Sequence, residues 1–314
     1  MADDADYDLL VVGSGPAGLA AGVAAGRQGL AAVVLEADAV GGELVNRHTI
    51  EGLPGHPETT GPDLRSTLVD QLGEAGGQVR LTAVEGVRRL DGAADPAGFA
   101  VETTEGSYRA RTVVVATGGR PVRLDVPGAE AYDGRGVFYC AVCDGPLYAG
   151  ETVAVAGGDD WALTDACYLT DHAERVIVLT ERPRLPAGES LRERVANHPA
   201  IEVRTATEVH GVGGGQVLEH LELVDNDGEY VEPVGGLYVQ QGVEPAASYL
   251  PEWVPRSDCG AVAVDQALET EVSGLFAAGD VRESSPRTVA AALGDGVTAC
   301  RSATRYLGER AETG

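Results

Sequence analysis

The chain has 314 residues, of which 44% are hydrophobic, enough to build one large domain or two medium domains with buried cores. Its 49 acidic residues against 23 basic ones give a formal net charge of −26, and every basic residue is an arginine. This charge disfavours nucleic acid as a partner.

The acid-rich, lysine-free composition favours a protein of salt-loaded cytoplasm, where a hydrated carboxylate surface keeps a protein soluble. At molar salt the Debye length is about 3 Å, so the repulsion among these charges is largely screened. An acidic protein of ordinary cytoplasm is the alternative.

The number of cysteines, five, is odd, and this argues against a secreted disulfide scaffold. The N-terminal residues MADDADYD carry no basic segment followed by an apolar one, and no apolar run reaches the roughly 18 residues of a membrane span. We therefore expect a cytoplasmic protein without membrane segments. Cys167, Cys259 and Cys300 are predicted to be small buried side chains.

A strand is predicted at 7–12, followed by the glycine turn GSGPAG at 13–18 and an alanine-rich helix to Gln28. In such a turn Gly13 permits the tight bend, Gly15 lets the backbone approach a pyrophosphate, and Gly18 lets helix and strand pack closely. The next strand, 31–35, ends at Glu36, where an acid suits the hydroxyls of a ribose. Flanking strands and a closing acid make dinucleotide binding the favoured interpretation over a chance glycine turn.

Further elements follow in order. A helix is predicted at 63–75, with Leu64, Leu68 and Leu72 on one face. Strands are predicted at 81–84, 99–103 and 112–116, with a loop at 91–98.

The hexapeptide CAVCDG at 140–145 is predicted to be a redox centre. Two cysteines at this spacing can form one disulfide, and the motif lowers the pKa of one thiol. Asp144 can then supply or remove the proton, although a turn former before Gly145 is an alternative role. Half of a zinc site is the other interpretation, but no second pair of ligands at suitable spacing accompanies this one.

A second strand, glycine turn and helix begins at 152–156, continues through Gly157, Gly158 and Asp159, and reaches Thr170, with the next strand at 176–180. This resembles a second nucleotide-binding fold inserted into the first. A hairpin turn is predicted at 213–215 and a strand at 237–241. The chain ends with a strand at 274–278, the pair Gly279 and Asp280, and a helix at 288–307.

The motifs GSGPAG at 13–18, GG at 41–42, ATGG at 116–119, CAVCDG at 140–145 and GLFAAGD at 274–280 closely resemble those of the low-molecular-weight thioredoxin reductases. The resemblance implies an α/β fold with two Rossmann-like nucleotide-binding domains, the second inserted into the first. An FAD-binding domain would comprise 1–119 and 247–314, and a pyridine-nucleotide-like domain with the cysteines would comprise 120–246. It also implies a homodimer that passes electrons from FAD through Cys140 and Cys143 to thioredoxin or a similar small redox protein.

Residue roles follow from the same resemblance. The pyrophosphate of FAD is expected at Gly13, Gly15, Pro16 and Ala17 in the first turn, where Ser14 is also a cofactor residue, and the adenosine ribose at Glu36. The remaining cofactor residues are Gly42 and Glu43 on the flavin side, Val84 near the adenine, Thr117 and Gly118, Gly279, Asp280 at the ribityl chain, and Arg287, Thr288 and Val289 beneath the isoalloxazine. A helix N-cap is a second possible role for Asp280. No metal ligand is expected.

Two departures from the family pattern concern the electron donor. Asp159 stands where the family has a third glycine, and Glu181 stands among the residues that hold the 2′-phosphate of NADPH. Both place negative charge where a phosphate should lie. NADPH is therefore doubtful as donor, and NADH, ferredoxin or another reduced flavin is the alternative. A non-catalytic flavin redox sensor is a further alternative, which the acid beside the dithiol disfavours.

Overall fold

The computed structural model describes residues 6–56, 58–90 and 98–313, and the chain divides into two compact units. Unit 1 comprises Met1–Arg120 and Glu244–Gly314, and unit 2 comprises Pro121–Val243. The sequence placed these boundaries after residues 119 and 246. Unit 2 is inserted into unit 1, and the two connecting segments, β7 (Gly119–Pro121) and β16 (Val243–Pro245), pair as a two-stranded sheet.

Unit 1 is built on a seven-stranded sheet in the order β3-β2-β1-β6-β5-β4, with β17 also paired to β6. The pairs among β3, β2, β1, β6 and β17 are parallel, whereas β4 and β5 are antiparallel. The strands are β1 (Asp6–Val12), β2 (Ala32–Glu36), β3 (Val79–Leu81), β4 (Val84–Leu90), β5 (Gly98–Thr103), β6 (Gly106–Val115) and β17 (Leu275–Ala277).

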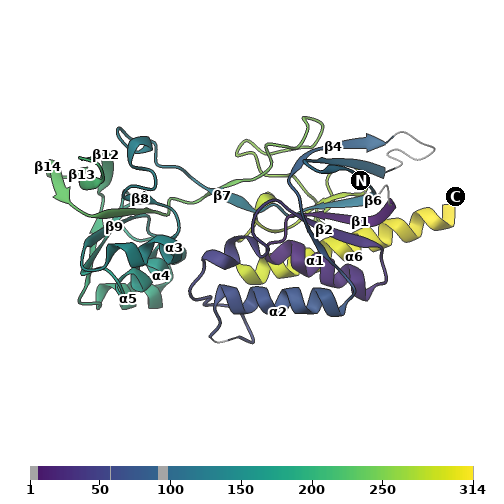
Figure 1. The fold of residues 1–314 in the computed structure, drawn as a ribbon, viewed down its shortest axis with the longest axis horizontal. Coiled ribbons are helices and arrows are strands. Elements are labelled where there is room, and N and C mark those ends of the chain that lie inside the picture. The colour runs from purple at the N-terminus through teal and green to yellow at the C-terminus, as the bar shows by residue number, and fades with distance from the viewer. Residues whose placement is uncertain (1–5, 57, 91–97, 314) are drawn as a thin grey trace. The chain divides into compact units, whose positions relative to one another are not determined.

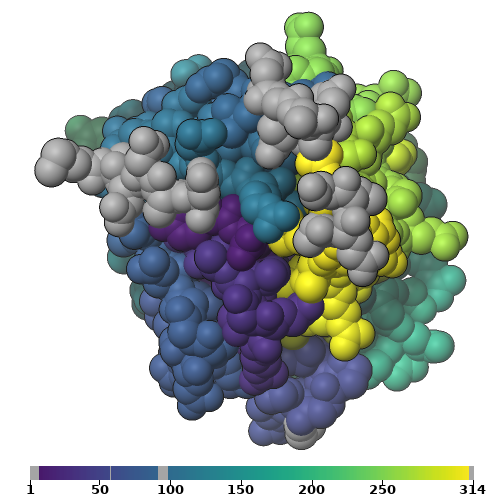
Figure 2. Space-filling view, turned by 90° about the vertical axis from the view of Figure 1, so that its right-hand side faces the viewer, coloured from purple at the N-terminus to yellow at the C-terminus, as the bar shows by residue number. Residues whose placement is uncertain are grey.

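Three helices cover one face of this sheet: α1 (Pro16–Arg27), α2 (Gly61–Glu74) and α6 (Val289–Thr313) (Figure 1). Successive residues of a strand point to opposite faces, and β1 is apolar on both. Leu9 and Val11 pack in the hydrophobic core that includes the helices. Leu10 and Val12 point to the opposite face of the sheet and pack in a second hydrophobic core of the unit. The purple N-terminal elements and the yellow α6 lie side by side on the face shown in Figure 2.

Unit 2 has a five-stranded parallel sheet in the order β11-β10-β9-β15-β8. Two helices pack on one face, and a three-stranded antiparallel sheet packs on the other. Its elements are β8 (Val137–Phe138), β9 (Thr152–Ala156), α4 (Asp160–Leu169), β10 (Arg175–Thr180), α5 (Glu189–Ala196), β11 (Ile201–Thr205), β12 (Glu208–Gly214), β13 (Leu218–Asp225), β14 (Gly228–Pro233) and β15 (Gly236–Val239).

Short helical turns complete the two units. They are η1 (Gly42–Asn46), η2 (Glu130–Tyr132), α3 (Ala141–Asp144), η3 (Gly145–Tyr148) and η4 (Gly279–Val281). Three of them, η1, α3 and η4, hold residues that the sequence assigned to the cofactor or redox site.

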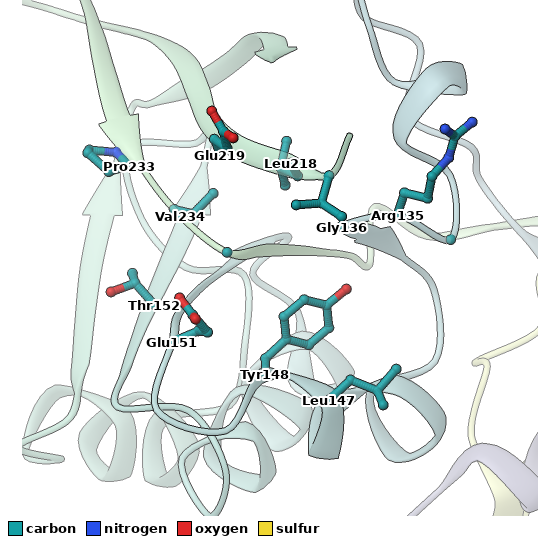
Figure 3. Close-up of a pocket in the computed structure, with 13 residues that line it drawn as sticks. Arg135, Gly136, Leu147, Tyr148, Glu151, Thr152, Leu218, Glu219, Pro233 and Val234 are labelled. Atoms are coloured by element: carbon teal, nitrogen blue, oxygen red, sulfur yellow. The ribbon is translucent and has the colours of Figure 1, made fainter. Parts of the chain in front are cut away.

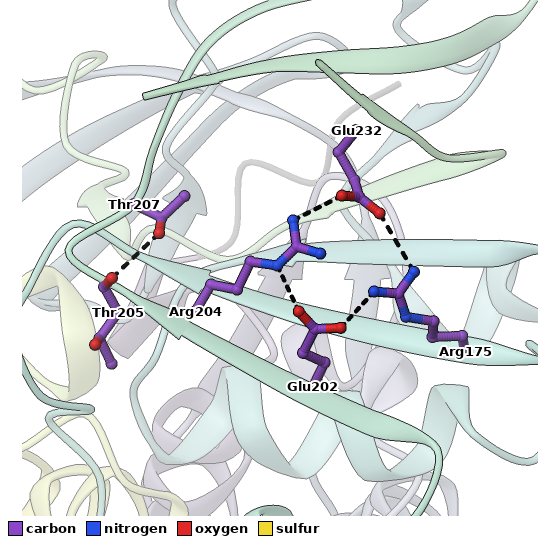
Figure 4. Close-up of polar contacts among 6 residues, drawn as sticks. All are labelled: Arg175, Glu202, Arg204, Thr205, Thr207 and Glu232. Atoms are coloured by element: carbon purple, nitrogen blue, oxygen red, sulfur yellow. Dashed lines mark hydrogen bonds and ion pairs between the residues drawn. The ribbon is translucent and has the colours of Figure 1, made fainter. Parts of the chain in front are cut away.

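A cluster of four charged side chains links three strands of unit 2 (Figure 4). Arg204 of β11 bonds to Glu202 at 2.6 Å and to Glu232 of β14 at 2.7 Å, and Arg175 of β10 bonds to the same two carboxylates. The hydrogen bonds from Arg204 and Arg175 lower the pKa of Glu202. Each carboxylate thus bridges two arginines, which makes this a network rather than isolated surface pairs.

Two sequence predictions need correction. The strand expected at 81–84 is the end of β3 and the start of β4, because Thr82 turns inward and its amide bonds to the carbonyl of Glu36 at 2.7 Å. Cys259 is exposed rather than buried, because it lies in a turn where its sulfur contacts the Ser257 hydroxyl at 3.2 Å. Cys167 is half-buried, and only Cys300 is buried. The loop predicted at 91–98 lies outside the described residues except for Gly98.

Among the described residues, no helix is long and apolar enough to cross a membrane. The same part of the chain contains no group of three or more His, Cys, Asp or Glu side chains placed to hold a metal ion.

Candidate functional site

The glycine turn of unit 1 combines close backbone packing with open space. Gly13 has φ +100°, and a Cβ there would lie 2.5 Å from the carbonyl oxygen of Ala116. Gly15 is the N-cap of α1, and a Cβ there would meet nothing within 4 Å. Since glycine has no side chain with which to cap the helix, the first amides of α1 point to a space that an anion can enter. This geometry fits the pyrophosphate of FAD.

Glu36, at the end of β2, is held beside this turn. One of its carboxylate oxygens accepts hydrogen bonds from the Ser14 amide at 2.8 Å and the Ser14 hydroxyl at 2.6 Å. The other accepts one from the Asp38 amide at 3.0 Å. The fold thus brings the acid expected at the ribose to the turn expected at the pyrophosphate.

Other predicted cofactor residues gather around the same turn. Gly42 of η1 packs on Gly15, since a Cβ on Gly42 would lie 3.1 Å from the Gly15 Cα. Thr117 adjoins Gly13, and its hydroxyl bonds to the carbonyl of Ala246 at 2.7 Å. Of the rest, Gly118 has φ +64°, Val84 begins β4, and Glu43 forms an ion pair with Arg47 at 3.7 Å.

Asp280, expected at the ribityl chain, lies in η4. Burial raises the pKa of its carboxyl group, and the hydroxyl of Ser285 donates a hydrogen bond to it at 3.0 Å. Gly279, just before it, packs against Ala17 of α1, since a Cβ there would lie 2.9 Å from the Ala17 Cβ. Arg287 has φ +55°, and the hydroxyl of Thr288 accepts a hydrogen bond from Ala291 in the first turn of α6, which begins at Val289.

Two residues that the sequence prediction missed hold this region together. Asp295 of α6 accepts hydrogen bonds from the Gly279 amide at 3.0 Å and from Arg282 at 2.6 and 3.1 Å. Both side chains are largely buried, with 14% of Arg282 and 13% of Asp295 exposed. The pair ties α6 to the turn that presents Asp280. Its two residues lie 13 positions apart and match no motif, so no local pattern indicates the contact.

The two cysteines of unit 2 form a disulfide, with their Cα atoms 5.3 Å apart. Cys140 is the N-cap of the short helix α3, and its sulfur accepts a hydrogen bond from the Cys143 amide at 3.1 Å. This amide favours a thiolate on Cys140 once the disulfide is opened. Cys143 is the more exposed of the two residues.

Asp144 directly follows the pair, and its amide bonds to the carbonyl of Cys140 at 3.1 Å. Burial raises the pKa of its carboxyl group above the ordinary value. Burial also raises the pKa of Tyr148, and the charge of Asp144 adds to that shift. A carboxyl group with a raised pKa beside a disulfide can donate and accept the proton of thiol exchange.

A cavity of about 650 Å³ opens in unit 2 beside the segment that follows the dithiol (Figure 3). Leu147 and Val217 line it with 77% and 55% of their surface exposed. Other lining residues are Arg135, Tyr148, Glu151 and Glu219. Exposed apolar side chains rimmed by charged ones are typical of a protein-binding surface.

The glycine turn of unit 2 differs from that of unit 1. Its N-cap residue is Asp159, whose carboxylate accepts a hydrogen bond from the Ala162 amide at 2.9 Å. Gly158 is buried, and a Cβ there would lie 3.1 Å from Leu185 and 3.3 Å from Pro186. This turn is capped and covered by the chain itself.

Comparison with known proteins places these features in a family. The family model described as pyridine nucleotide-disulphide oxidoreductase matches residues 7–296. The thioredoxin reductase of Bacillus subtilis (strain 168) is 31% identical over 318 residues, covering 100% of this chain and 98% of the relative.

Solved structures agree with this result. The thioredoxin reductase of Lactococcus lactis in its FR conformation has a TM-score of 0.92 at 28% identity, covering 96% of this chain and 99% of that one. A ferredoxin-flavin thioredoxin reductase of Clostridium acetobutylicum has a TM-score of 0.53 at 25% identity, covering 97% and 99%.

Proposed function

The chain belongs to the pyridine nucleotide-disulphide oxidoreductase family, and on that premise we propose that it passes electrons from FAD through Cys140 and Cys143 to the disulfide of thioredoxin or a similar small redox protein. It is a disulfide reductase of the thioredoxin reductase type. The observation that carries the proposal is the Cys140–Cys143 disulfide at the start of α3, directly followed in the chain by the half-buried Asp144, whose pKa is raised by burial.

Unit 1 is the FAD-binding domain in this proposal, and FAD supplies the two electrons that open the disulfide. The open space above Gly15 and the first amides of α1 receive the pyrophosphate, Glu36 binds the adenosine ribose, and Asp280 binds the ribityl chain. The other assigned contacts are Gly13, Ser14, Pro16, Ala17, Gly42, Glu43, Val84, Thr117, Gly118, Gly279, Arg287, Thr288 and Val289.

The chemistry of unit 2 is thiol–disulfide exchange. Reduction of the pair leaves two thiols, and one thiolate attacks a sulfur of the substrate disulfide to give a mixed disulfide. The second cysteine then displaces the substrate, which leaves as a dithiol while the Cys140–Cys143 disulfide forms again. Asp144 takes up and returns the proton that each exchange requires.

The protein substrate docks, in this proposal, at the cavity lined by Leu147 and Tyr148 of the segment that follows the dithiol in the chain (Figure 3). Leu147 lies four residues after Cys143 and exposes 77% of its surface there. An apolar anchor next to the redox pair suits a partner that must bring its own disulfide close.

We assign the electron donor to NADH, reduced ferredoxin or another reduced flavin rather than to NADPH. The carboxylate of Glu181 disfavours the 2′-phosphate that NADPH alone carries, and the carboxylate of Asp159 disfavours a pyrophosphate, since like charges repel. The similarity to a protein named a ferredoxin-flavin thioredoxin reductase supports the ferredoxin and flavin alternatives. We also propose that the protein is a homodimer and that it works in a salt-rich cytoplasm.

The test measures reduction of thioredoxin disulfide by the flavin-loaded protein, with dithionite as the reductant and oxygen excluded. The wild type should turn over, whereas Cys140→Ser and Cys143→Ser should not exceed the background rate although both stay yellow. Cys259→Ser is the matched control, because Cys259 is an exposed thiol in unit 1. Turnover in either active-site variant, or no turnover in the wild type, would contradict the proposal; the latter is what a redox sensor would give.

A further inference from the structure

Asp159 and Gly15 hold the same place in the two glycine turns. Each follows a parallel strand and a Gly-x pair, and each is the N-cap of the next helix. At Gly15 the space around a Cβ is empty to 4 Å, which is the space that a dinucleotide pyrophosphate needs. In unit 2 this position carries a carboxylate instead of a hydrogen atom.

The Asp159 carboxylate already accepts a hydrogen bond from a helix amide that a bound phosphate would use. It accepts a hydrogen bond from the Ala162 amide at 2.9 Å, within the first turn of α4. A phosphate at a helix N-terminus binds through these same amides and through the positive end of the helix dipole. The Asp159 carboxylate therefore occupies one of these N–H groups and also repels a second anion.

A second carboxylate holds the covering segment over the turn. Asp160 accepts a hydrogen bond from the Gly188 amide at 2.7 Å. Between this contact and the end of β10, Leu185 and Ala187 are buried in the hydrophobic core of the unit. Leu185 and Pro186 pack against Gly158, so the chain closes over the glycine that follows β9.

Glu181, which directly follows β10, would discriminate only against the 2′-phosphate of NADPH and would be compatible with the ribose of NADH. Asp159 acts on the pyrophosphate, which NADH and NADPH share. Glu181 alone would therefore allow NADH to bind, whereas Asp159 would exclude it. Because Asp159 already caps α4, we expect NADH to be excluded.

We infer that the Asp159 carboxylate occupies the place of a pyrophosphate and that unit 2 therefore rejects pyridine dinucleotides of both kinds. Of the donors in the proposed function, this leaves reduced ferredoxin and a reduced flavin. This inference rests on the proposed function of FAD and the dithiol. FAD bound in unit 1 would take up two protons and two electrons, either one electron from each of two reduced iron–sulfur proteins or both from one dihydroflavin. The donor loses these two electrons, which would then open the Cys140–Cys143 disulfide.

The test measures binding of ADP-ribose, NADH and NADPH by calorimetry to the flavin-loaded wild type and to Asp159→Gly, with flavin bleaching as a second readout. Glycine in place of aspartate at an N-cap costs only a few tenths of a kcal/mol, so the variant should fold. Asp227→Asn, at an exposed hairpin of the same unit, removes one negative charge far from the turn in sequence and is the control for net charge.

The wild type and Asp227→Asn should bind none of the three probes below about 1 mM, and Asp159→Gly should bind ADP-ribose at least about tenfold more tightly than the wild type. Micromolar binding or rapid bleaching of the wild type would overturn the inference. So would a variant that gains no affinity, or an equal gain in Asp227→Asn. The dithionite assay separates these results from the proposed function, because it needs no nucleotide.

Discussion

The two glycine turns of this protein share a backbone plan and differ in one side chain. Both connect a parallel strand to a helix through a Gly-x pair and an extended N-cap residue. Gly15 leaves the first amides of α1 accessible, whereas Asp159 occupies an amide of α4 with its own carboxylate. If the proposed roles of the two turns hold, the comparison teaches that a nucleotide-binding fold and a nucleotide-binding site are separable, because one N-cap side chain turns an accessible helix N-terminus into a capped one.

The largest effect is expected from Gly15→Asp, which gives the glycine turn of unit 1 the N-cap residue type of the turn in unit 2. The backbone of Gly15, with φ −65° and ψ −175°, accepts any residue, so the fold should survive. The new carboxylate would fill the pyrophosphate space, and FAD affinity should fall by at least about 100-fold, which is about 2.7 kcal/mol. The flavin-to-protein absorbance ratio measures the loss.

Gly73→Asp is the matched control for this variant. Gly73 lies on the exposed side of α2 in the same unit, and a Cβ there would also meet nothing within 4 Å. A yellow Gly15→Asp protein with unchanged FAD affinity would remove the basis of the comparison.

In the proposed function unit 2 acts through its dithiol rather than through its glycine turn, and Asp144→Asn tests the part that the dithiol site plays. Loss of the proton donor should slow thioredoxin reduction by about 100-fold, the lower end of the range for acid–base catalysis. Because the pKa of Asp144 is raised by burial, the protonated carboxyl persists above its ordinary range and is lost as pH rises through the raised value. The same raised pKa contributes stability to the folded state at low pH, and this contribution is lost as the pH rises through the raised value.

The measurement is the pH profile of turnover with dithionite as reductant. The wild type should show a step at the raised pKa of Asp144, and the asparagine variant should lack it. Identical profiles for the two proteins would exclude Asp144 from proton transfer.

A smaller effect is expected from Asp295→Ala, which releases the turn that presents Asp280 next to the open site of unit 1. The variant loses the acceptor for the Gly279 amide and leaves Arg282 without its bidentate partner. FAD affinity should fall about tenfold, or about 1.4 kcal/mol. Flavin release during dialysis measures the effect.

Asp8→Ala is the control for this loss, because it breaks the Asp8–Arg111 pair of the same unit. Equal loss of flavin from the two variants would mean that the Asp295 pair supports the fold in general and not the cofactor site.

The smallest effect concerns the stability of unit 2 alone. Glu232→Gln removes a charge that bridges Arg175 and Arg204, with only 15% of the Glu232 side chain exposed (Figure 4). The unfolding free energy should fall by about 1 kcal/mol at low salt and by less at molar salt, since screening weakens the network. Urea unfolding measures the change, and the FAD affinity of unit 1 should not move.

Glu102→Gln in unit 1 serves as the comparison, because its partner Arg88 is 63% exposed and such a surface pair contributes little. A larger loss from Glu102→Gln than from Glu232→Gln would show that the network is not a special source of stability.

The sequence by itself determined the two glycine turns, the buried strands before them and the dithiol, because these features depend on residues that are close in the chain. A short valine- and leucine-rich run indicated the strand at 7–12, and the spacing of Gly13, Gly15 and Gly18 indicated a turn that the structure contains. The positions of Asp159 and Glu181 also signalled that unit 2 departs from the usual pattern.

Only the tertiary structure decided how those turns are used. The capping contact of Asp159, the closure of Leu185 over Gly158 and the link from Asp295 to Gly279 join separate elements of the chain. The sequence also missed the exposure of Cys259 and the cavity beside Leu147, since burial depends on which distant segments pack around a residue. Local spacing fixes what an element is, whereas the accessibility of its amides and side chains depends on what the fold brings against it.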